Sequence, residues 1–187
     1  MAGPLPVKFK EGTYEIESER RGYALELAVD FVRMEYTRHR FWEKDDTPVV
    51  PLKPQTLEDV IGTWPQGKIN VRISDYMFRP HQKWTITAVP DGGGYLGGPY
   101  YKIVIEGTNR ALAATAGAEI VTVPEFTGAP EQLWRIDQLT DGTYRIMPKE
   151  VPGTDKELVL VSVGDSTPSL GEFDMNSDNS KWNFRDH

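Results

Sequence analysis

A short tryptophan-containing stretch occurs three times in this 187-residue sequence, and it restricts the possible folds more than any other feature. The copies are His81-Gln82-Lys83-Trp84-Thr85-Ile86, Glu131-Gln132-Leu133-Trp134-Arg135-Ile136 and, in degraded form, Asn179-Ser180-Lys181-Trp182-Asn183-Phe184. The tryptophans are 50 and 48 residues apart. Periods in this range are typical of repeated supersecondary units. The sequence therefore predicts three similar units, each ending on a Trp-x-Ile or Trp-x-Phe strand.

A second recurrence marks the start of each unit. It reads Gly12-Thr13-Tyr14-Glu15-Ile16, Pro99-Tyr100-Tyr101-Lys102-Ile103 and Gly142-Thr143-Tyr144-Arg145-Ile146. Between the opening and closing strands, short apolar runs predict two more strands per unit. These runs are 23–29 and 70–73, then 111–114 and 120–123, then 158–161 and 170–173. Twelve strands in three pseudo-repeats predict an all-β protein with the β-trefoil fold, a closed barrel with a hairpin cap. The last strand is expected to pair beside the first.

The first unit is longer than the other two. Tyr14 and Trp84 are 70 residues apart, whereas the equivalent separations are 33 and 38 residues. We therefore expect one domain over residues 1–187, with repeats at about 12–88, 99–138 and 142–185 and an insertion at about 30–68. Within the insertion, Thr56 to Ile61 has the pattern of a short helix with a threonine N-cap.

Composition excludes several functional classes. There is no cysteine, which removes disulfides, thiolate nucleophiles and cysteine-bound zinc. The net charge of −7 disfavours binding to nucleic acid or anionic membranes. No apolar run has the length of a signal peptide or a membrane span, so we expect a cytoplasmic protein. The three histidines are scattered and no nucleophile motif is present, so neither a metal, a cofactor nor an enzymatic activity is expected.

The Gln-x-Trp closing strands resemble those of ricin-type trefoil lectins. The wider pattern is similar to the fungal β-trefoil serine-protease inhibitors, which are poor in cysteine, unglycosylated and without a signal peptide. The residues that carry this likeness are those of the opening motif at 12–16, the stretches 132–136 and 141–146, and the closing stretch 181–184. The resemblance implies a reactive surface loop in the first unit, between its second and third strands. In this sequence that position is the basic and aromatic segment from Val32 to Trp42.

The leading functional hypothesis is therefore inhibition of a trypsin-like protease through this segment. Arg38 or Arg40 would enter the acidic specificity pocket of the protease, and aromatic side chains would contribute buried contacts. The predicted protease-binding residues are Arg33, Tyr36, Arg38, His39, Arg40, Phe41 and Trp42. The same segment also has an alternating pattern, because Val32, Met34 and Tyr36 alternate with polar residues, so it could be an ordinary strand extension.

Two other functions remain open from the sequence. A lectin would place a polar side chain beside an exposed aromatic ring, and Tyr101 with Asn109 is the best candidate carbohydrate-binding pair. The residues before the expected glutamines are His81 and Glu131, and Ser180 replaces the third glutamine, so the ricin-type galactose pattern is incomplete. A third hypothesis is an assembly protein that docks a partner through the insertion.

Two further features have structural interpretations. Trp84, Trp134 and Trp182 could stack on sugars, but their position on closing strands favours a role in the structural core. Asp91 to Gly98 is rich in glycine, yet it lacks the Lys-Ser/Thr pair of a phosphate-binding loop. We interpret it as a mobile loop between units.

Overall fold

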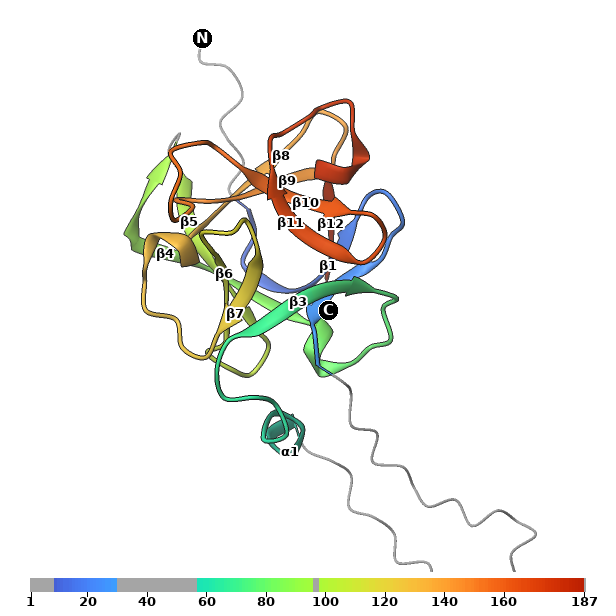
Figure 1. Cartoon of the computed structure of the whole chain (residues 1–187), viewed down its shortest axis with the longest axis vertical. Coiled ribbons are helices and arrows are strands. Elements are labelled where there is room, and N and C mark those ends of the chain that lie inside the picture. Colours follow the sequence, from blue (N-terminus) through green and yellow to red (C-terminus); the bar gives the residue numbers. More distant parts are fainter. Residues whose placement is uncertain (1–8, 30–56, 96–97, 187) are drawn as a thin grey trace, which may run out of the picture.

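A computed structural model describes residues 9–29, 57–95 and 98–186. The described residues form twelve strands, one short α-helix and three single-turn 3-10 helices (Figure 1). The strands are β1 (Gly12–Ser18), β2 (Ala24–Leu27), β3 (Ile69–Ser74), β4 (Trp84–Tyr95), β5 (Gly98–Ile105), β6 (Ala111–Ala114), β7 (Ile120–Val123), β8 (Trp134–Gln138), β9 (Tyr144–Pro148), β10 (Val159–Val163), β11 (Thr167–Gly171) and β12 (Trp182–Asp186). The helices are α1 (Leu57–Ile61), η1 (Pro80–Gln82), η2 (Pro130–Gln132) and η3 (Asp178–Ser180).

Six strands form a closed barrel. The pairings run β1–β4, β4–β5, β5–β8, β8–β9, β9–β12 and β12–β1, all antiparallel. The last pairing joins the two ends of the described chain in a continuous register, from Tyr14 opposite Asp186 to Ser18 opposite Trp182. Closure leaves no open barrel edge. The predicted pairing of the last strand with the first is confirmed.

The other six strands form three hairpins that cap the barrel, β2–β3, β6–β7 and β10–β11. Neighbouring hairpins are connected to one another: β3 pairs with β7, Ile73 N donates to Ser166 O, and Leu170 N donates to Ala118 O. Figure 1 shows these hairpins arranged around one centre, with one hairpin contributed by each unit. Unit one comprises β1–β4, unit two β5–β8 and unit three β9–β12, so the predicted β-trefoil is the observed fold.

The three repeated tryptophans occupy equivalent places in the core. Trp84, Trp134 and Trp182 are fully buried, and each lies opposite the tyrosine of an opening strand in the sheet register. Each indole Nε1 donates a hydrogen bond of 2.8–2.9 Å to a leucine carbonyl on the second strand of its unit. The acceptors are Leu25, Leu112 and Leu160. The three bonds are equivalent, so they can be used to match positions in one unit with the corresponding positions in the other two.

Phe9 closes the end of the barrel that lies away from the cap. Its ring centroid lies 4.7–5.8 Å from the rings of four aromatic residues on the opening and closing strands. Those residues are Tyr14, Tyr101, Tyr144 and Phe184. The sequence pattern assigns residue 9 to a leader segment, but its side chain belongs to the structural core.

The last part of the unit-one insertion packs onto the barrel. Val60 and Trp64 are buried in the main hydrophobic cluster. The buried guanidinium of Arg110 donates to Pro65 O and Gly67 O, at 2.9 and 2.8 Å, and burial lowers the pKa of this group. The predicted short helix is α1. No helix in the described part of the chain has the length and apolarity that crossing a membrane requires.

Two local predictions are wrong. The third strand of unit three is β11 at Thr167–Gly171, so Phe173 lies after the strand, where the guanidinium of Arg145 sits 5.1 Å from its ring. The glycine-rich stretch lies between units one and two, as predicted, but its described residues belong to the paired strands β4 and β5 instead of a loop. Its glycines allow close packing, because a Cβ on Gly94 would lie 2.5 Å from Gly98 O.

Candidate functional site

A buried carboxylate in unit one is the centre of a polar cluster. Glu26 on β2 is only 2% exposed, and Gln82 Nε2 donates to its Oε1 at 2.7 Å. Arg72, its register partner on β3, donates from Nε to Oε2 at 2.7 Å. His81 Nε2 lies 3.3 Å from the same oxygen. Both oxygens of a buried carboxylate are therefore satisfied, which keeps its position fixed.

The environment of Glu26 favours its charged form. Burial by itself raises the pKa of the carboxyl, but hydrogen bonds from His81, Arg72 and Gln82 outweigh burial and hold the pKa below its usual value. The side chain is therefore a carboxylate at neutral pH. It attracts the Arg72 guanidinium, whose Nη2 also donates to Val29 O at 2.9 Å.

Gln82 connects this cluster to an exposed loop between β3 and η1. Its Oε1 accepts hydrogen bonds from Met77 N at 2.8 Å and Arg79 N at 3.3 Å. Its Nε2, besides bonding Glu26, donates to Asp75 O at 2.7 Å. The amide of one buried side chain thus holds three backbone positions of the loop. Such a loop is preorganised, because its shape does not depend on a ligand.

The loop presents two aromatic rings at the surface. Phe78 is 74% exposed, and its ring centroid lies 4.7 Å from that of the half-buried Tyr76. The backbone of Phe78 has a φ of 57°, in the left-handed region. For a residue with a side chain this conformation costs roughly 1–2 kcal/mol. Strain of this kind clusters at functional sites. We call Glu26, Arg72, Tyr76, Phe78 and Gln82 the unit-one site.

The other two units lack this combination. The residue after the tryptophan-bound leucine is Glu26 in unit one, Ala113 in unit two and Val161 in unit three. In unit two, Gln132 accepts from Thr127 N at 2.8 Å, as Gln82 does from Met77 N. The position equivalent to Phe78 is therefore Gly128, which also has a left-handed φ of 84°. Ser180 replaces the glutamine in unit three. The exposed ring, the carboxylate and the glutamine occur together in unit one.

The residues predicted from the sequence fall elsewhere. Arg33, Tyr36, Arg38, His39, Arg40, Phe41 and Trp42 lie outside the described residues. Tyr101 is 2% exposed and its hydroxyl donates to Phe9 O at 3.0 Å, whereas Asn109 is exposed in the turn between β5 and β6. The structure therefore does not bring Tyr101 and Asn109 together as a carbohydrate site, because a ring inside the barrel cannot stack on a sugar.

Sequence reasoning missed Glu26, Arg72 and Phe78. His81 stands out in the sequence as a departure from the lectin pattern, but its contact with Glu26 joins residues 55 positions apart. The run Tyr76-Met77-Phe78 was a usable signal, because three apolar residues lie between a predicted strand and the glutamine. Among the described residues, no group of three or more histidine, aspartate or glutamate side chains could hold a metal ion.

Residues 80–169 match the model of a family described as "Ricin-type beta-trefoil lectin domain-like". The matched segment runs from η1 into β11 and contains all of unit two. Over this segment, which is slightly less than half of the chain, the sequence is similar to the ricin-type β-trefoil lectin domains. No curated protein matches the sequence.

Solved structures with a similar fold have little sequence in common with this chain. A mosquitocidal holotoxin is 14% identical with a TM-score of 0.62; the match covers 96% of this chain but only 18% of the toxin chain. The designed threefold-symmetric protein ThreeFoil is 19% identical with a TM-score of 0.59, covering 94% and 99% of the two chains. SeviL, solved with the asialo-GM1 saccharide, is 13% identical with a TM-score of 0.52, covering 95% and 98%. At these identities the similarity establishes the β-trefoil fold.

Proposed function

We propose that this protein binds carbohydrate through the unit-one site, as a trefoil lectin. The observation that carries the proposal is Phe78, an exposed aromatic residue held in a left-handed conformation where unit two has a glycine. The family match and the saccharide-bound SeviL structure support the same class of ligand. Protein folds host many activities, so the argument depends on the residues of the site.

In this proposal each part of the site has a distinct task. The rings of Phe78 and Tyr76 pack against the apolar face of a sugar ring. Arg72, whose side chain is partly exposed, directs its remaining N–H groups toward sugar hydroxyls, since its Nε and Nη2 are already held by Glu26 and Val29 O. Glu26 is buried and does not reach the ligand. It is a positioning residue that acts through Arg72 and Gln82.

Glycan-array screening followed by calorimetric titration of the strongest ligand tests the proposal. Phe78→Ala should weaken binding by at least tenfold, because the main stacking surface is removed, while the thermal unfolding temperature is kept. Met175→Ala is the matched control, since Met175 is 68% exposed in the equivalent loop of unit three and should leave affinity unchanged. The proposal is contradicted if no glycan on the array is bound, or if the Phe78→Ala variant and the native protein bind with equal affinity.

The protease-inhibitor hypothesis is a separate proposal that depends on Arg38 and Arg40. Its test is a panel of trypsin-, subtilisin- and papain-like proteases, with Arg38→Ala and Arg40→Ala as variants. No contact among the described residues favours it over carbohydrate binding.

A further inference from the structure

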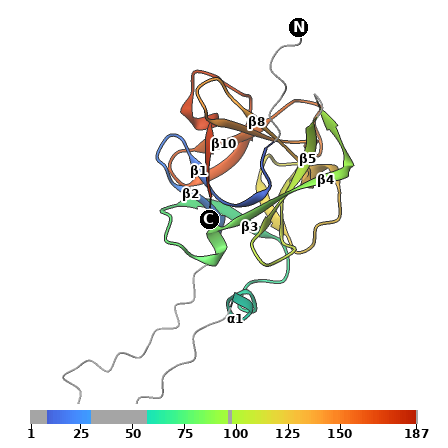
Figure 2. The same cartoon turned by 180° about the vertical axis from the view of Figure 1, so that it is seen from behind.

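The end of the barrel that lies away from the cap is hollowed by a small cavity of about 280 Å3. Figure 2 gives the view from behind, where the C-terminal end of the chain lies beside β1, with which β12 pairs. We call this hollow the barrel-end cavity. Its wall is formed by the segment before β1 and by β1, β8, β9 and β12, and includes Phe9, Lys10, Tyr14, Tyr144, Phe184 and Asp186.

Four aromatic rings of this wall stand at steep angles to one another. The Tyr144 ring is inclined by 88° to that of Phe9 and by 85° to that of Phe184, with centroids 5.6 and 5.0 Å away. The rings of Phe9 and Tyr14 are inclined by 51°. Phe9, Tyr144 and Phe184 are only half-buried, so part of each side chain stays accessible. A compact group in the cavity therefore meets aromatic surface on more than one side, as in the aromatic cages that bind quaternary ammonium groups.

The tyrosine hydroxyls near this wall are already used by the backbone. Tyr14 donates from its hydroxyl to Lys10 O at 2.6 Å, and Tyr101, which contacts Phe9, donates to Phe9 O at 3.0 Å. The rings of Phe9 and Phe184 carry no polar atom. The described wall thus offers few donors to a ligand rich in hydroxyl groups. A quaternary ammonium group needs none, because it has no N–H and no lone pair.

Two exposed side chains of opposite charge complete the wall, Lys10 and Asp186. Asp186 lies opposite Tyr14 in the register of β1 and β12. Burial, and after it the negative charge of Asp186, raises the pKa of Tyr14, so the carboxylate acts on a ring of the wall. A cation in the cavity is attracted both by the rings and by this carboxylate. Lys10 favours an anionic group on the same ligand.

We propose that the barrel-end cavity binds the phosphocholine group. Its trimethylammonium end lies against the aromatic rings and near Asp186, and its phosphate lies toward Lys10. The cavity volume of about 280 Å3 is just below the range of about 300–1,000 Å3 that is usual for larger ligands, which suits a group of this size. The cavity shares no residue with the unit-one site, so this proposal does not depend on carbohydrate binding.

Amide chemical-shift titration by NMR with free phosphocholine at millimolar concentration tests the proposal on the full chain. Saturable shifts are expected at residues 9–11, 136–138 and 184–186, which surround the cavity. Phosphoethanolamine has the same charged groups but an ammonium that carries N–H donors. It should bind at least roughly fivefold more weakly, because a strongly hydrated ammonium loses more water contacts on entering an aromatic cage.

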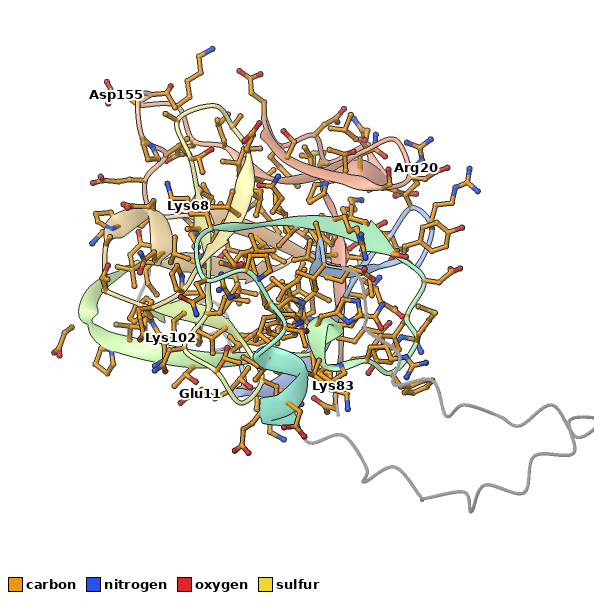
Figure 3. The ribbon with its side chains drawn as sticks, turned by 60° about the horizontal axis from the view of Figure 1, so that its bottom comes forward. Glu11, Arg20, Lys68, Lys83, Lys102 and Asp155 are labelled. Atoms are coloured by element: carbon orange, nitrogen blue, oxygen red, sulfur yellow. The ribbon has the colours of Figure 1, made fainter. Side chains whose placement is uncertain are left out.

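Variants at exposed positions keep the fold and remove one charge each. Asp186→Asn and Lys10→Gln should each weaken phosphocholine binding by roughly threefold or more, because each removes an attraction to one end of the ligand. Asp155→Asn is the matched control and should bind as the native protein does. In Figure 3, Asp155 lies at the upper edge of the view and Glu11, which follows Lys10, near the lower edge. Phe78→Ala should also keep the native affinity.

The outcomes separate this proposal from the proposed function. The barrel-end site is overturned if phosphocholine causes no saturable shift at these amides, if phosphoethanolamine binds equally well, or if Asp186→Asn keeps the native affinity. Shifts that persist in Phe78→Ala support it whatever the glycan array shows. Co-sedimentation with phosphatidylcholine vesicles then identifies the source of the group. Sedimentation of the native protein but not of Asp186→Asn indicates a lipid headgroup, whereas binding of free phosphocholine alone indicates a soluble ligand.

Discussion

The proposed role of Phe78 sets the stability of the fold against ligand binding. Its left-handed backbone costs roughly 1–2 kcal/mol, whereas glycine adopts this conformation without a steric penalty. We expect Phe78→Gly to leave the free energy of unfolding equal to that of the native protein or up to about 1 kcal/mol higher, because the strain relieved exceeds the entropy that glycine adds to the unfolded chain. Binding should be lost. Urea denaturation and calorimetric titration measure the two effects.

Gly128 provides the matched control for Phe78. It has the same left-handed conformation in unit two, and a Cβ there would meet nothing within 4 Å. Gly128→Ala should therefore lower stability by about 1 kcal/mol through strain alone. If Gly128→Ala is neutral, or if Phe78→Gly is clearly destabilising, the strain argument is wrong.

Glu15 gives the fold a pH dependence that can be measured. Burial, a hydrogen bond to Glu17 and repulsion by the charge of Glu17 raise its pKa from 4.5 to about 8, against an opposing effect of Arg185. Between these two values the folded state keeps a proton that the unfolded chain has lost, so stability falls as pH rises from 4.5 toward 8.

Glu15→Gln should remove this pH-dependent loss. We expect the variant to gain thermal stability over the native protein at pH 8 and to gain much less near pH 4.5, where the folded protein holds the proton and the unfolded chain still holds it about half of the time. Melting curves at the two pH values measure the difference. Glu125→Gln, at an exposed position, should show no such trend, and an equal gain at both pH values would contradict the assignment to Glu15.

At the residue scale, the sequence predicts the core better than the site. The three tryptophans are visible because they repeat, and repetition reflects the equivalent hydrogen bonds to Leu25, Leu112 and Leu160. The pairing of Glu26 with Gln82 is not visible, because it joins residues 56 positions apart and occurs in one unit. The left-handed backbone conformation of Phe78 cannot be predicted from its residue type.

At the scale of elements, the tryptophan-to-leucine bonds hold each closing strand against the hairpin of its own unit. Trp84→Phe, Trp134→Phe and Trp182→Phe should each reduce the free energy of unfolding by roughly 2–4 kcal/mol. Each leaves a buried carbonyl without its donor and a cavity where the larger ring was. Chemical denaturation of the three variants is the measurement. A loss well below 1 kcal/mol in any unit would show that its indole bond does not matter.

The spacing from the tryptophans predicts most strands, because Trp84, Trp134 and Trp182 each stand at the first position of the closing strand of their unit. It places β3 and β7 correctly and misplaces β11, whose segment after Gly171 leaves the sheet. Hairpin β4–β5 is missed for a different reason. In a sequence, a run of glycines indicates a flexible segment. In the folded chain, the absence of side chains lets the two strands approach each other closely.

At the scale of the whole molecule, the proposed carbohydrate binding can be tested separately from the predicted protease-binding segment. Deletion of residues 33–44 should leave the affinity for the best glycan within about twofold, because the unit-one site is built from β2, β3 and η1. The buried residues Val60 and Trp64 remain to hold the end of the insertion. Calorimetric titration and far-UV circular dichroism measure affinity and fold. If the deletion variant is folded but no longer binds glycan, the binding site must be assigned to the insertion instead of the unit-one site.

The pairing of β1 with β12 affects the rate at which the molecule can fold. Tyr14 and Asp186 become neighbours only when nearly the entire chain has been gathered, whereas a hairpin such as β4–β5 forms from adjacent segments. Folds dominated by such distant pairings fold in about milliseconds to seconds, because chain entropy is lost before the contacts form. Once the ring has closed, no barrel strand can separate without breaking pairings on both of its sides. We therefore expect slow folding to be matched by slow unfolding, which gives the closed barrel a long lifetime.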